Sequence, residues 1–224
     1  MVENLKNKFI EIAKKIFNKI VSIPEPNLKG ERDIEYSFLA YNMKEEKGNA
    51  LDFGCGASYT SLMACRKGYN VTAIDLTDVK WYYRHPKLKF VRGDILKAEL
   101  KNESYDLILN ISSIEHVGLK GRFDTAEAIS DGDLLAMKRM WELLKPGKIM
   151  ILTLPIGKER VFYPFHRVYG QKRFYKIIEG YKIVKKEFWV KNDINQWLLT
   201  DEKTAFGYKP TEYCYGIGLF ILKK

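Results

Sequence analysis

The stretch LDFGCGAS, residues 51–58, decides the fold. It begins as an apolar run through Asp52 and continues into a turn with Gly54 and Gly56. Two glycines allow a tight turn whose backbone lies close to a ligand, and a helix that follows such a turn presents N–H groups at its start. A dinucleotide-binding fingerprint would have a third glycine at position 59, where this chain has Tyr59. The stretch therefore predicts a strand, a nucleotide-binding turn and a helix.

Strands and helices alternate around this turn. The hydrophobic periodicity predicts helices over 31–43, 58–67 and 131–144. Apolar runs predict five strands, at 49–53, 71–75, 88–95, 105–112 and 148–155. Two later strands, at 180–190 and 215–223, have only a polar loop between them and no strong helix. Buried strands that alternate with helices are typical of a parallel sheet covered on both faces.

The fold class expected is α/β, a Rossmann-like three-layer α-β-α sandwich whose mostly parallel sheet ends in a C-terminal antiparallel strand pair. We expect a single domain overall, with residues 1–48 as an N-terminal helical cap or lid on residues 49–224. Residues 3–21 have apolar side chains at spacings of three and four, which indicates an amphipathic helix. That helix packs on its own domain or makes peripheral contact with a membrane surface.

Composition bears on the cellular location of the protein and on its charged partners. No apolar run reaches the roughly 18 residues that span a bilayer, and the N-terminal residues contain no apolar segment typical of a secretory signal. The three cysteines form no CxxC pair, so the expected location is cytoplasmic. Of the net charge of +10, residues 145–224 contribute sixteen Lys or Arg against seven Asp or Glu. This excess fits either a solvated lysine-rich face or an anionic partner such as RNA.

Acidic residues follow the predicted strands at regular positions. Asp75 ends the second strand, 23 residues after Asp52, where a carboxylate can accept hydrogen bonds from ribose hydroxyls. Asp94 follows the third strand. The D-x-G-x-G arrangement around Gly54 resembles motif I of the class I S-adenosylmethionine (SAM) dependent methyltransferases. Many relatives have a further glycine at the position of Ser58.

This resemblance implies SAM as the cofactor. It places Asp52 near the ammonium of the methionine part, Asp94 at the adenine amino group and Ile95 against the adenine ring. The remaining cofactor-binding residues that it implies lie in the turn and after the second and fourth strands: Gly54, Cys55, Gly56, Leu76, Asn110, Ile111 and Ser112.

The region beyond the fourth strand resembles a narrower group. Its matching residues are Glu115-His116, Gly118-Leu119, Asp131, Asp133, the LKPG turn and His166-Arg167-Val168-Tyr169. The group is a poorly characterised branch of the class I methyltransferases that is linked with glycan and polysaccharide methylation. With motif I, the resemblance covers residues 50–175. It implies a small-molecule or glycan acceptor that is methylated on a sugar hydroxyl. The loop after Leu119 departs from the pattern, which leaves the substrate open.

A sugar hydroxyl needs a general base, and His116 and His166 are the candidates because each follows a strand at the carboxyl edge. Either histidine could instead only shape the pocket or order a loop. The predicted substrate-binding residues are Glu115, Arg167 and Tyr169, since a guanidinium can hold a carboxylate or phosphate with two hydrogen bonds.

Metal binding is not expected. Asp124, Asp131 and Asp133 have the right chemistry for a divalent ion, but helix N-capping explains Asp131 and Asp133 better.

Three alternatives to glycan methylation stay open. They are methylation of RNA, which the basic C-terminal third favours, methylation of a small metabolite, and SAM binding without catalysis. Against RNA, the chain has no NPPY motif. The sequence predicts no oligomeric state.

Overall fold

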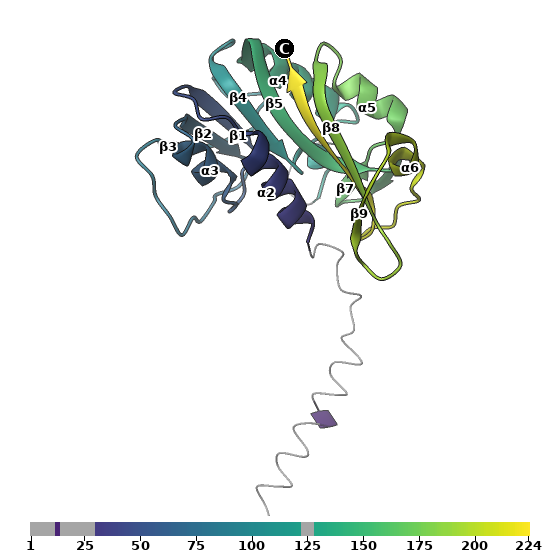
Figure 1. Ribbon diagram of the computed structural model, residues 1–224. Helices are drawn as coiled ribbons and strands as arrows, with labels where there is room; N and C mark the ends of the chain where they lie inside the picture. Colours follow the sequence, from purple (N-terminus) through teal and green to yellow (C-terminus); the bar gives the residue numbers. More distant parts are fainter. Residues whose placement is uncertain (1–11, 14–29, 122–127) are drawn as a thin grey trace, which may run out of the picture.

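The computed structural model describes residues 12–13, 30–121 and 128–224. Helices lie on both faces of an eight-stranded sheet (Figure 1). The strands of this sheet are β1 Asn49–Phe53, β2 Asn70–Asp75, β3 Leu88–Arg92, β4 Tyr105–Ile111, β5 Leu144–Ile156, β8 Lys182–Lys191, β9 Trp197–Thr200 and β10 Gly216–Lys223. A separate hairpin contains β6 Arg160–Phe162 and β7 His166–Val168. The helices are α2 Glu31–Asn42, α3 Thr60–Arg66, α4 Gly132–Leu143, α5 Gln171–Ile177, α6 Glu202–Gly207 and the 3-10 turn η1 Ile114–His116.

The strand order is β3-β2-β1-β4-β5-β10-β8-β9, and the first five strands are parallel. From β1 the chain builds outward to β2 and β3, and then returns to the other side of β1 as β4. In open parallel sheets the ligand crevice lies at such a change of direction, outside the carboxyl ends of the strands. The predicted parallel core is confirmed, and it places the carboxyl ends of β1, β2, β3 and β4 at one edge.

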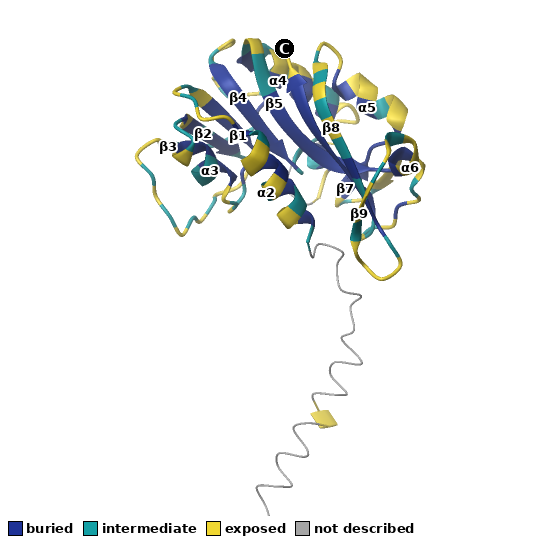
Figure 2. Ribbon diagram, viewed as in Figure 1, coloured by how far each residue is buried: buried dark blue, intermediate teal, exposed yellow. Residues whose placement is uncertain are grey.

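Two hydrophobic clusters on opposite faces of the sheet confirm the three-layer prediction. On one face α2 and α3 cover β1 and β4, with Leu39, Cys65 and Leu109 in the contact. On the other face α4, α5 and α6 cover the sheet, with Met137 and Phe174 in the contact. The strands between the helices are buried, as Figure 2 shows in dark blue. Alternate residues of each strand point to opposite faces, so a buried strand must be apolar on both.

The C-terminal strands form the predicted antiparallel pair. β10 lies between β5 and β8 and is antiparallel to both. The segment between the pair is not the plain polar loop that we expected, because it contains β9 and α6. Both elements are short, and four to six residues carry too little periodicity to be recognised. The hairpin β6–β7 and helix α5 were not predicted for the same reason.

The LKPG segment differs from its prediction as a turn. β5 begins at Leu144, directly after α4, and Leu144 pairs with Tyr105 before an irregularity in the register. The strand therefore contains Pro146 and Gly147, and both are exposed at its start. Proline is tolerated at such a position because pairing there is incomplete.

The predicted amphipathic helix over 3–21 lies outside the described residues except for 12–13, and so does most of the predicted cap. The division at residue 48 stays a prediction. Within the described ranges, no helix has both the length and the apolar character needed to cross a membrane.

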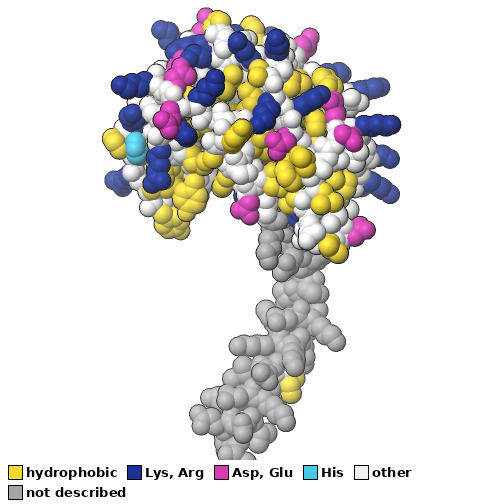
Figure 3. All heavy atoms as spheres, in the orientation of Figure 1, with side chains coloured by type: hydrophobic (Ala, Val, Ile, Leu, Met, Phe, Trp, Pro, Cys, Tyr) yellow, Lys and Arg dark blue, Asp and Glu magenta, His cyan; other side chains and the backbone are white. Residues whose placement is uncertain are grey.

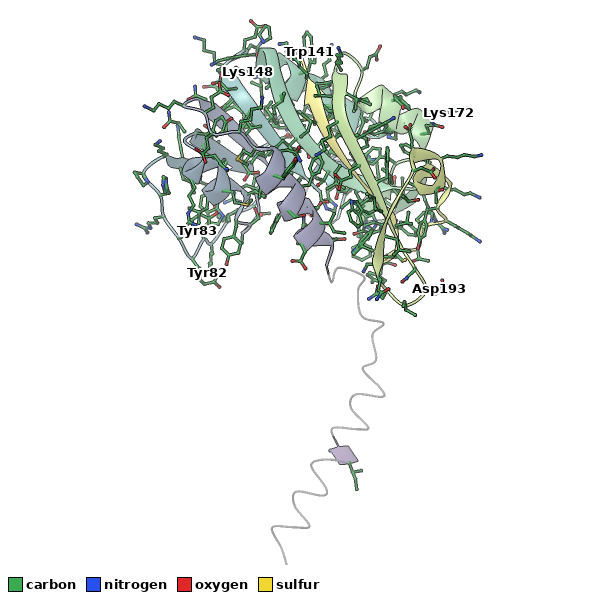
Figure 4. All side chains as sticks on the ribbon, viewed as in Figure 1. Tyr82, Tyr83, Trp141, Lys148, Lys172 and Asp193 are labelled. Atoms are coloured by element: carbon green, nitrogen blue, oxygen red, sulfur yellow. The ribbon has the colours of Figure 1, made fainter. Side chains whose placement is uncertain are left out.

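Several lysines of the C-terminal third project into solvent, whereas Lys191 is buried. Lys172 and Lys176 on α5 and Lys182 and Lys186 on β8 are exposed. Figure 3 shows basic side chains along the right rim of the molecule, and Figure 4 labels Lys172 there. Lys186 pairs with Glu202 of α6 at 2.5 Å. This arrangement fits the solvated lysine-rich face, and contact with RNA stays a prediction.

Candidate cofactor and acceptor site

The glycine turn after β1 has the backbone conformation that its two glycines permit. Gly54 and Gly56 have φ values of +62° and +47°, in the left-handed region. A Cβ on Gly54 would lie 2.6 Å from the Cβ and Oγ of Ser113, so the turn and the segment after β4 interlock. A Cβ on Gly56 would meet no atom within 4 Å. The space over Gly56 is therefore open to a ligand.

Asp52 ties the end of β1 to the first turn of α3. Its Oδ2 accepts hydrogen bonds from Thr60 Oγ1 and Ser61 Oγ, both at 2.6 Å, and its side chain is buried. Burial raises the pKa of Asp52 to about 6, although the two hydroxyl donors act in the opposite direction. The predicted contact with the cofactor ammonium stays a prediction. In this structure Asp52 positions the start of helix α3.

Asp75 contacts the glycine turn directly. Its Oδ2 accepts a hydrogen bond of 3.0 Å from Gly56 N, and its Oδ1 accepts from Thr77 N at 3.0 Å. The adjacent Leu76 is exposed, and Cys55 in the turn is buried. Burial raises the pKa of the Cys55 thiol, which keeps it in the neutral form. Asp75 thus lies at the turn, where the sequence predicts the ribose.

The third aspartate lies on the next strand. Asp94 follows β3, and its Oδ1 accepts from Leu96 N at 2.9 Å. Gly93 N donates to Asp75 O at 2.8 Å, which joins the ends of β2 and β3. Asp94 lines a groove of about 570 Å³, whereas Ile95 is buried in the core. A second groove of about 380 Å³ lies at the amino ends of the strands, beside Asn49 and Asn70, and contains none of the predicted site residues.

An aromatic loop after β2, residues 76–87, also fastens to the glycine turn. Trp81 Nε1 donates to Gly56 O at 2.9 Å, and Tyr83 OH donates to Ser58 O at 2.6 Å. The rings of Trp81 and Tyr83 stack with centroids 5.7 Å apart. Figure 4 shows Tyr83 and the fully exposed Tyr82 in this loop. Sequence reasoning missed this contact, although the run WYY at 81–83, six residues after the predicted ribose acid Asp75, was a signal.

The end of β4 differs from expectation. Asn110 was expected beside the sulfonium, but its side chain is fully buried and its Nδ2 points at the sulfurs of Met137 (3.6 Å) and Met140 (3.8 Å) on α4. Asn110 therefore belongs to the core, because it occupies the α4 face of a strand that is buried on both sides. Ile111 points to the other face, toward α2 and α3, and is largely buried. Ser112 has φ +44°, and its N donates to Thr153 O at 3.0 Å.

The two histidines lie near each other in different surroundings. His116 Nδ1 lies 2.6 Å from Phe165 O, and because a carbonyl only accepts, Nδ1 carries the hydrogen. His116 Nε2 lies 3.8 Å from Glu115 Oε1. His166 is buried, and its ring contacts those of Phe162 and Tyr215. Of the two candidates, His116 has the more exposed side chain and the orientation that a base needs.

Arg167 and Tyr169 require a correction. Both are buried, and Arg167 donates to Val117 O at 2.5 Å and to Ser130 O at 3.3 Å. Burial raises the pKa of Tyr169 well above its ordinary value. Arg167 thereby joins β7 to the segments on either side of 122–127, and backbone carbonyls take its donors, which does not support a role as a substrate anchor. The sequence could not indicate this, because short elements around them provide the burial.

Asp133 also differs from its expected role as a helix cap. It is fully buried, and both of its oxygens accept from Arg173, at 2.6 Å and 2.9 Å, which makes it an ion-pair residue and not a helix cap. Asp131 occupies the N-cap of α4 but makes no side-chain cap hydrogen bond. Asp124 lies outside the described residues. In the part of the chain that the structure describes, no group of three or more His, Cys, Asp or Glu side chains is placed to hold a metal ion.

Two glutamates of α2 belong to the site and were missed from the sequence. Glu35 is fully buried, and its Oε1 accepts from Ser112 Oγ at 2.5 Å and from Thr153 Oγ1 at 2.6 Å. Glu31 accepts from Tyr215 OH at 3.0 Å. Both interact electrostatically with Glu115, which is also buried. The predicted role of Glu115 in substrate binding stays a prediction. No local signal could have found these contacts, since they join residues 77 or more positions apart.

Curated relatives and solved structures resemble this chain. The ubiquinone biosynthesis O-methyltransferase of Rickettsia akari is 33% identical over 91 residues, which are 38% of this chain and 36% of that protein. The chain spans between about a third and a half of the length of the curated relatives that it matches.

Two solved structures share the fold. The Burkholderia thailandensis 1,6-didemethyltoxoflavin-N1-methyltransferase, solved with S-adenosylhomocysteine, has a TM-score of 0.58 and 13% identity, covering 98% of this chain and 87% of that one. A SAM-dependent methyltransferase from Mesorhizobium loti has a TM-score of 0.56 and 15% identity, covering 85% and 97%. The Rossmann-like methyltransferase fold expected from the sequence is confirmed.

A family model described as "Caenorhabditis protein of unknown function, DUF268" matches residues 84–205, more than half of the chain. The match spans β3 to β5, the η1 turn, the β6–β7 hairpin and most of the C-terminal strands. The chain therefore belongs to the DUF268 family.

Proposed function

We propose that the chain is a SAM-dependent methyltransferase that methylates a hydroxyl group of a sugar or glycan. The observation that carries the first part is the position of Asp52, Asp75 and Asp94 at or just after the ends of three adjacent parallel strands, with Asp75 bonded to the glycine turn. The methyltransferase relatives and the solved neighbours with S-adenosylhomocysteine support it. The open space over Gly56 would allow a nucleoside to bind against the backbone.

The residues present suit this cofactor. Asp75 offers carboxylate oxygens to ribose hydroxyls, and Asp94, after β3, offers a carboxylate acceptor to an amino group. SAM, when bound, supplies an electrophilic methyl group on a sulfonium, and displacement leaves the electron pair on sulfur. Positioning of the acceptor and removal of its proton are then the tasks of the protein.

His116 is the residue that we propose as the general base. The Phe165 carbonyl fixes Nδ1 as the protonated nitrogen, so Nε2 is the nitrogen that takes a proton. As the new O–CH3 bond forms, the hydroxyl proton passes to Nε2 and leaves the imidazole positively charged. Glu115 Oε1 lies 3.8 Å from Nε2, beside the position of that imidazolium.

Calorimetry with S-adenosylhomocysteine tests the cofactor part of the proposal. We expect binding to the wild-type protein. Absence of heat with both SAM and S-adenosylhomocysteine would overturn the proposal at its base.

Mass spectrometry of methyl transfer from isotopically labelled SAM tests the acceptor, with sugars, nucleotide sugars and total RNA as candidates. We expect label in the sugar fraction and a rate about 10²–10⁴-fold lower in His116→Ala. His85→Ala is the matched control, because His85 lies at the amino end of β3, away from the glycine turn. If the label appeared in the RNA fraction alone, the acceptor would be RNA and the proposal of a sugar acceptor would be wrong.

A further inference from the structure

Three glutamates converge beneath the first turns of α2. Glu35 accepts hydrogen bonds from Ser112, after β4, and from Thr153 in β5. Glu31, one turn earlier, accepts from Tyr215, the residue before β10. Glu115, in η1, interacts electrostatically with both. Glu31, Glu35 and Glu115 are called the carboxylate cluster below.

One oxygen of this cluster has no partner. The side chain of Glu115 is only 3% exposed, and its Oε2 makes no hydrogen bond with any of the described residues. A buried carboxylate oxygen that lacks a donor costs a few kcal/mol, so native proteins rarely leave one in that state. The orphan atom points to a donor that arrives from outside the chain.

The charges around the cluster favour a cation. Burial, reinforced by Glu35, raises the pKa of Glu115 to about 8 and that of Glu31 to about 7. Near neutral pH both groups therefore hold protons that a bound cation could displace. Arg32 already pairs with Glu35 Oε2 at 2.6 Å. The other titratable groups that face the cluster are His116 from η1, His166 and Tyr169 from β7, Lys191 from β8 and Tyr215.

The position of the cluster assigns it to the acceptor and not to the cofactor. Its partners come from the segments that follow β4, end β5 and precede β10. Asp52, Asp75 and Asp94, which are proposed to hold SAM, lie at the ends of β1, β2 and β3. Ser112, which the resemblance places beside the cofactor, contacts Glu35 and is where the two groups meet. A donor that reaches Glu115 Oε2 would therefore belong to the methyl acceptor.

We propose that Glu31, Glu35 and Glu115 form a binding subsite for a protonated amine, so that the acceptor is a sugar that carries a free amino group. This inference rests on the proposed function. An ammonium has three N–H donors and no acceptor, which matches a cluster of carboxylate oxygens. Hydrogen bonds between ionised partners are about twice as strong as neutral ones. Binding of the amine ionises Glu31 and Glu115 and releases their protons to solvent.

Carboxyl ¹³C NMR of glutamate-labelled protein tests the subsite with methylammonium chloride as the probe. Glu115→Gln and Glu31→Gln identify the two resonances, and the exposed Glu99→Gln is the matched control. We expect methylammonium to lower the apparent pKa of Glu115 by about one unit at ten times its dissociation constant. Tetramethylammonium, which has the same charge but no N–H donor, should leave that pKa unchanged.

Three results would overturn the inference. The first is that methylammonium leaves the apparent pKa of Glu115 unchanged at about 100 mM, a concentration that would detect even a weak ligand. The second is an equal pKa shift with tetramethylammonium. The third is a pKa shift produced by SAM alone. The last result would mean that the cluster holds the cofactor's own ammonium. The test does not depend on catalysis. A protein that binds S-adenosylhomocysteine but shows no methylammonium effect would retain the proposed function and lose only the amine subsite.

Discussion

Replacement of Glu115 by glutamine should change how the stability of the protein depends on pH. Burial raises the pKa of Glu115 from its ordinary 4.5 to about 8 in the folded state. Between these values the folded protein holds a proton that the unfolded chain has released. The free energy of unfolding therefore falls as the pH rises through this window. Glutamine has nearly the same shape and stays neutral. The free energy of unfolding of the variant therefore lacks the decrease that ionisation of Glu115 causes as the pH rises.

The size of the effect follows from the two pKa values. Each pH unit inside the window lowers the free energy of unfolding by about 1.4 kcal/mol. From pH 5 to pH 8 the wild-type protein should lose about 3–4 kcal/mol more than Glu115→Gln. The full figure applies because the side chain is almost completely buried and solvent does not screen it.

Urea unfolding at pH 5, 6, 7 and 8 measures this difference directly. Asp52, whose pKa burial also raises, contributes the same trend to both proteins and cancels in the comparison. The expected result is a variant that is relatively more stable at pH 8 than at pH 5. A difference between the two proteins that is constant across this range within about 1 kcal/mol would refute the reasoning, since Glu115 would then ionise normally.

Further outcomes concern the glycine turn and its neighbours. Gly54→Ala should lower the free energy of unfolding by about 2–4 kcal/mol, since its Cβ would lie 2.6 Å from Ser113. Gly56→Ala, which meets no neighbour, should cost only about 1–2 kcal/mol, and urea unfolding compares the two. Asp75→Asn should weaken S-adenosylhomocysteine binding about 10-fold to 100-fold in calorimetry. Trp81→Phe removes the 2.9 Å bond to the turn and should weaken the same binding about fivefold with an unchanged circular dichroism spectrum.

The sequence predicted the fold and the cofactor half of the site because their signals are local. The run from Leu51 to Thr60 contains the strand end, the turn and the helix start within ten residues. Asp75 and Asp94 needed only the rule that parallel strands end at the same edge of a sheet. Asn110 failed because β4 is buried on both faces, and the sequence does not show which face each side chain takes.

The acceptor half depends on contacts that are distant in sequence. Glu35 meets Thr153 across 118 positions, and Glu31 meets Tyr215 across 184. No periodicity in a single sequence encodes such pairs. Arg167 was predicted as a substrate anchor from its residue type, and only the packing around it shows that backbone carbonyls take its donors.

The bond from Trp81 to the carbonyl of Gly56 gives the protein an optical reporter of its own. Of the four tryptophans, Trp141 lies on α4, while Trp189 and Trp197 lie on β8 and β9, at the opposite edge of the sheet from β1 to β3. Arrival of an adenine ring would alter the emission of one indole and leave the other three as an internal reference. Occupancy could thus be followed in unlabelled protein, in real time, by fluorescence.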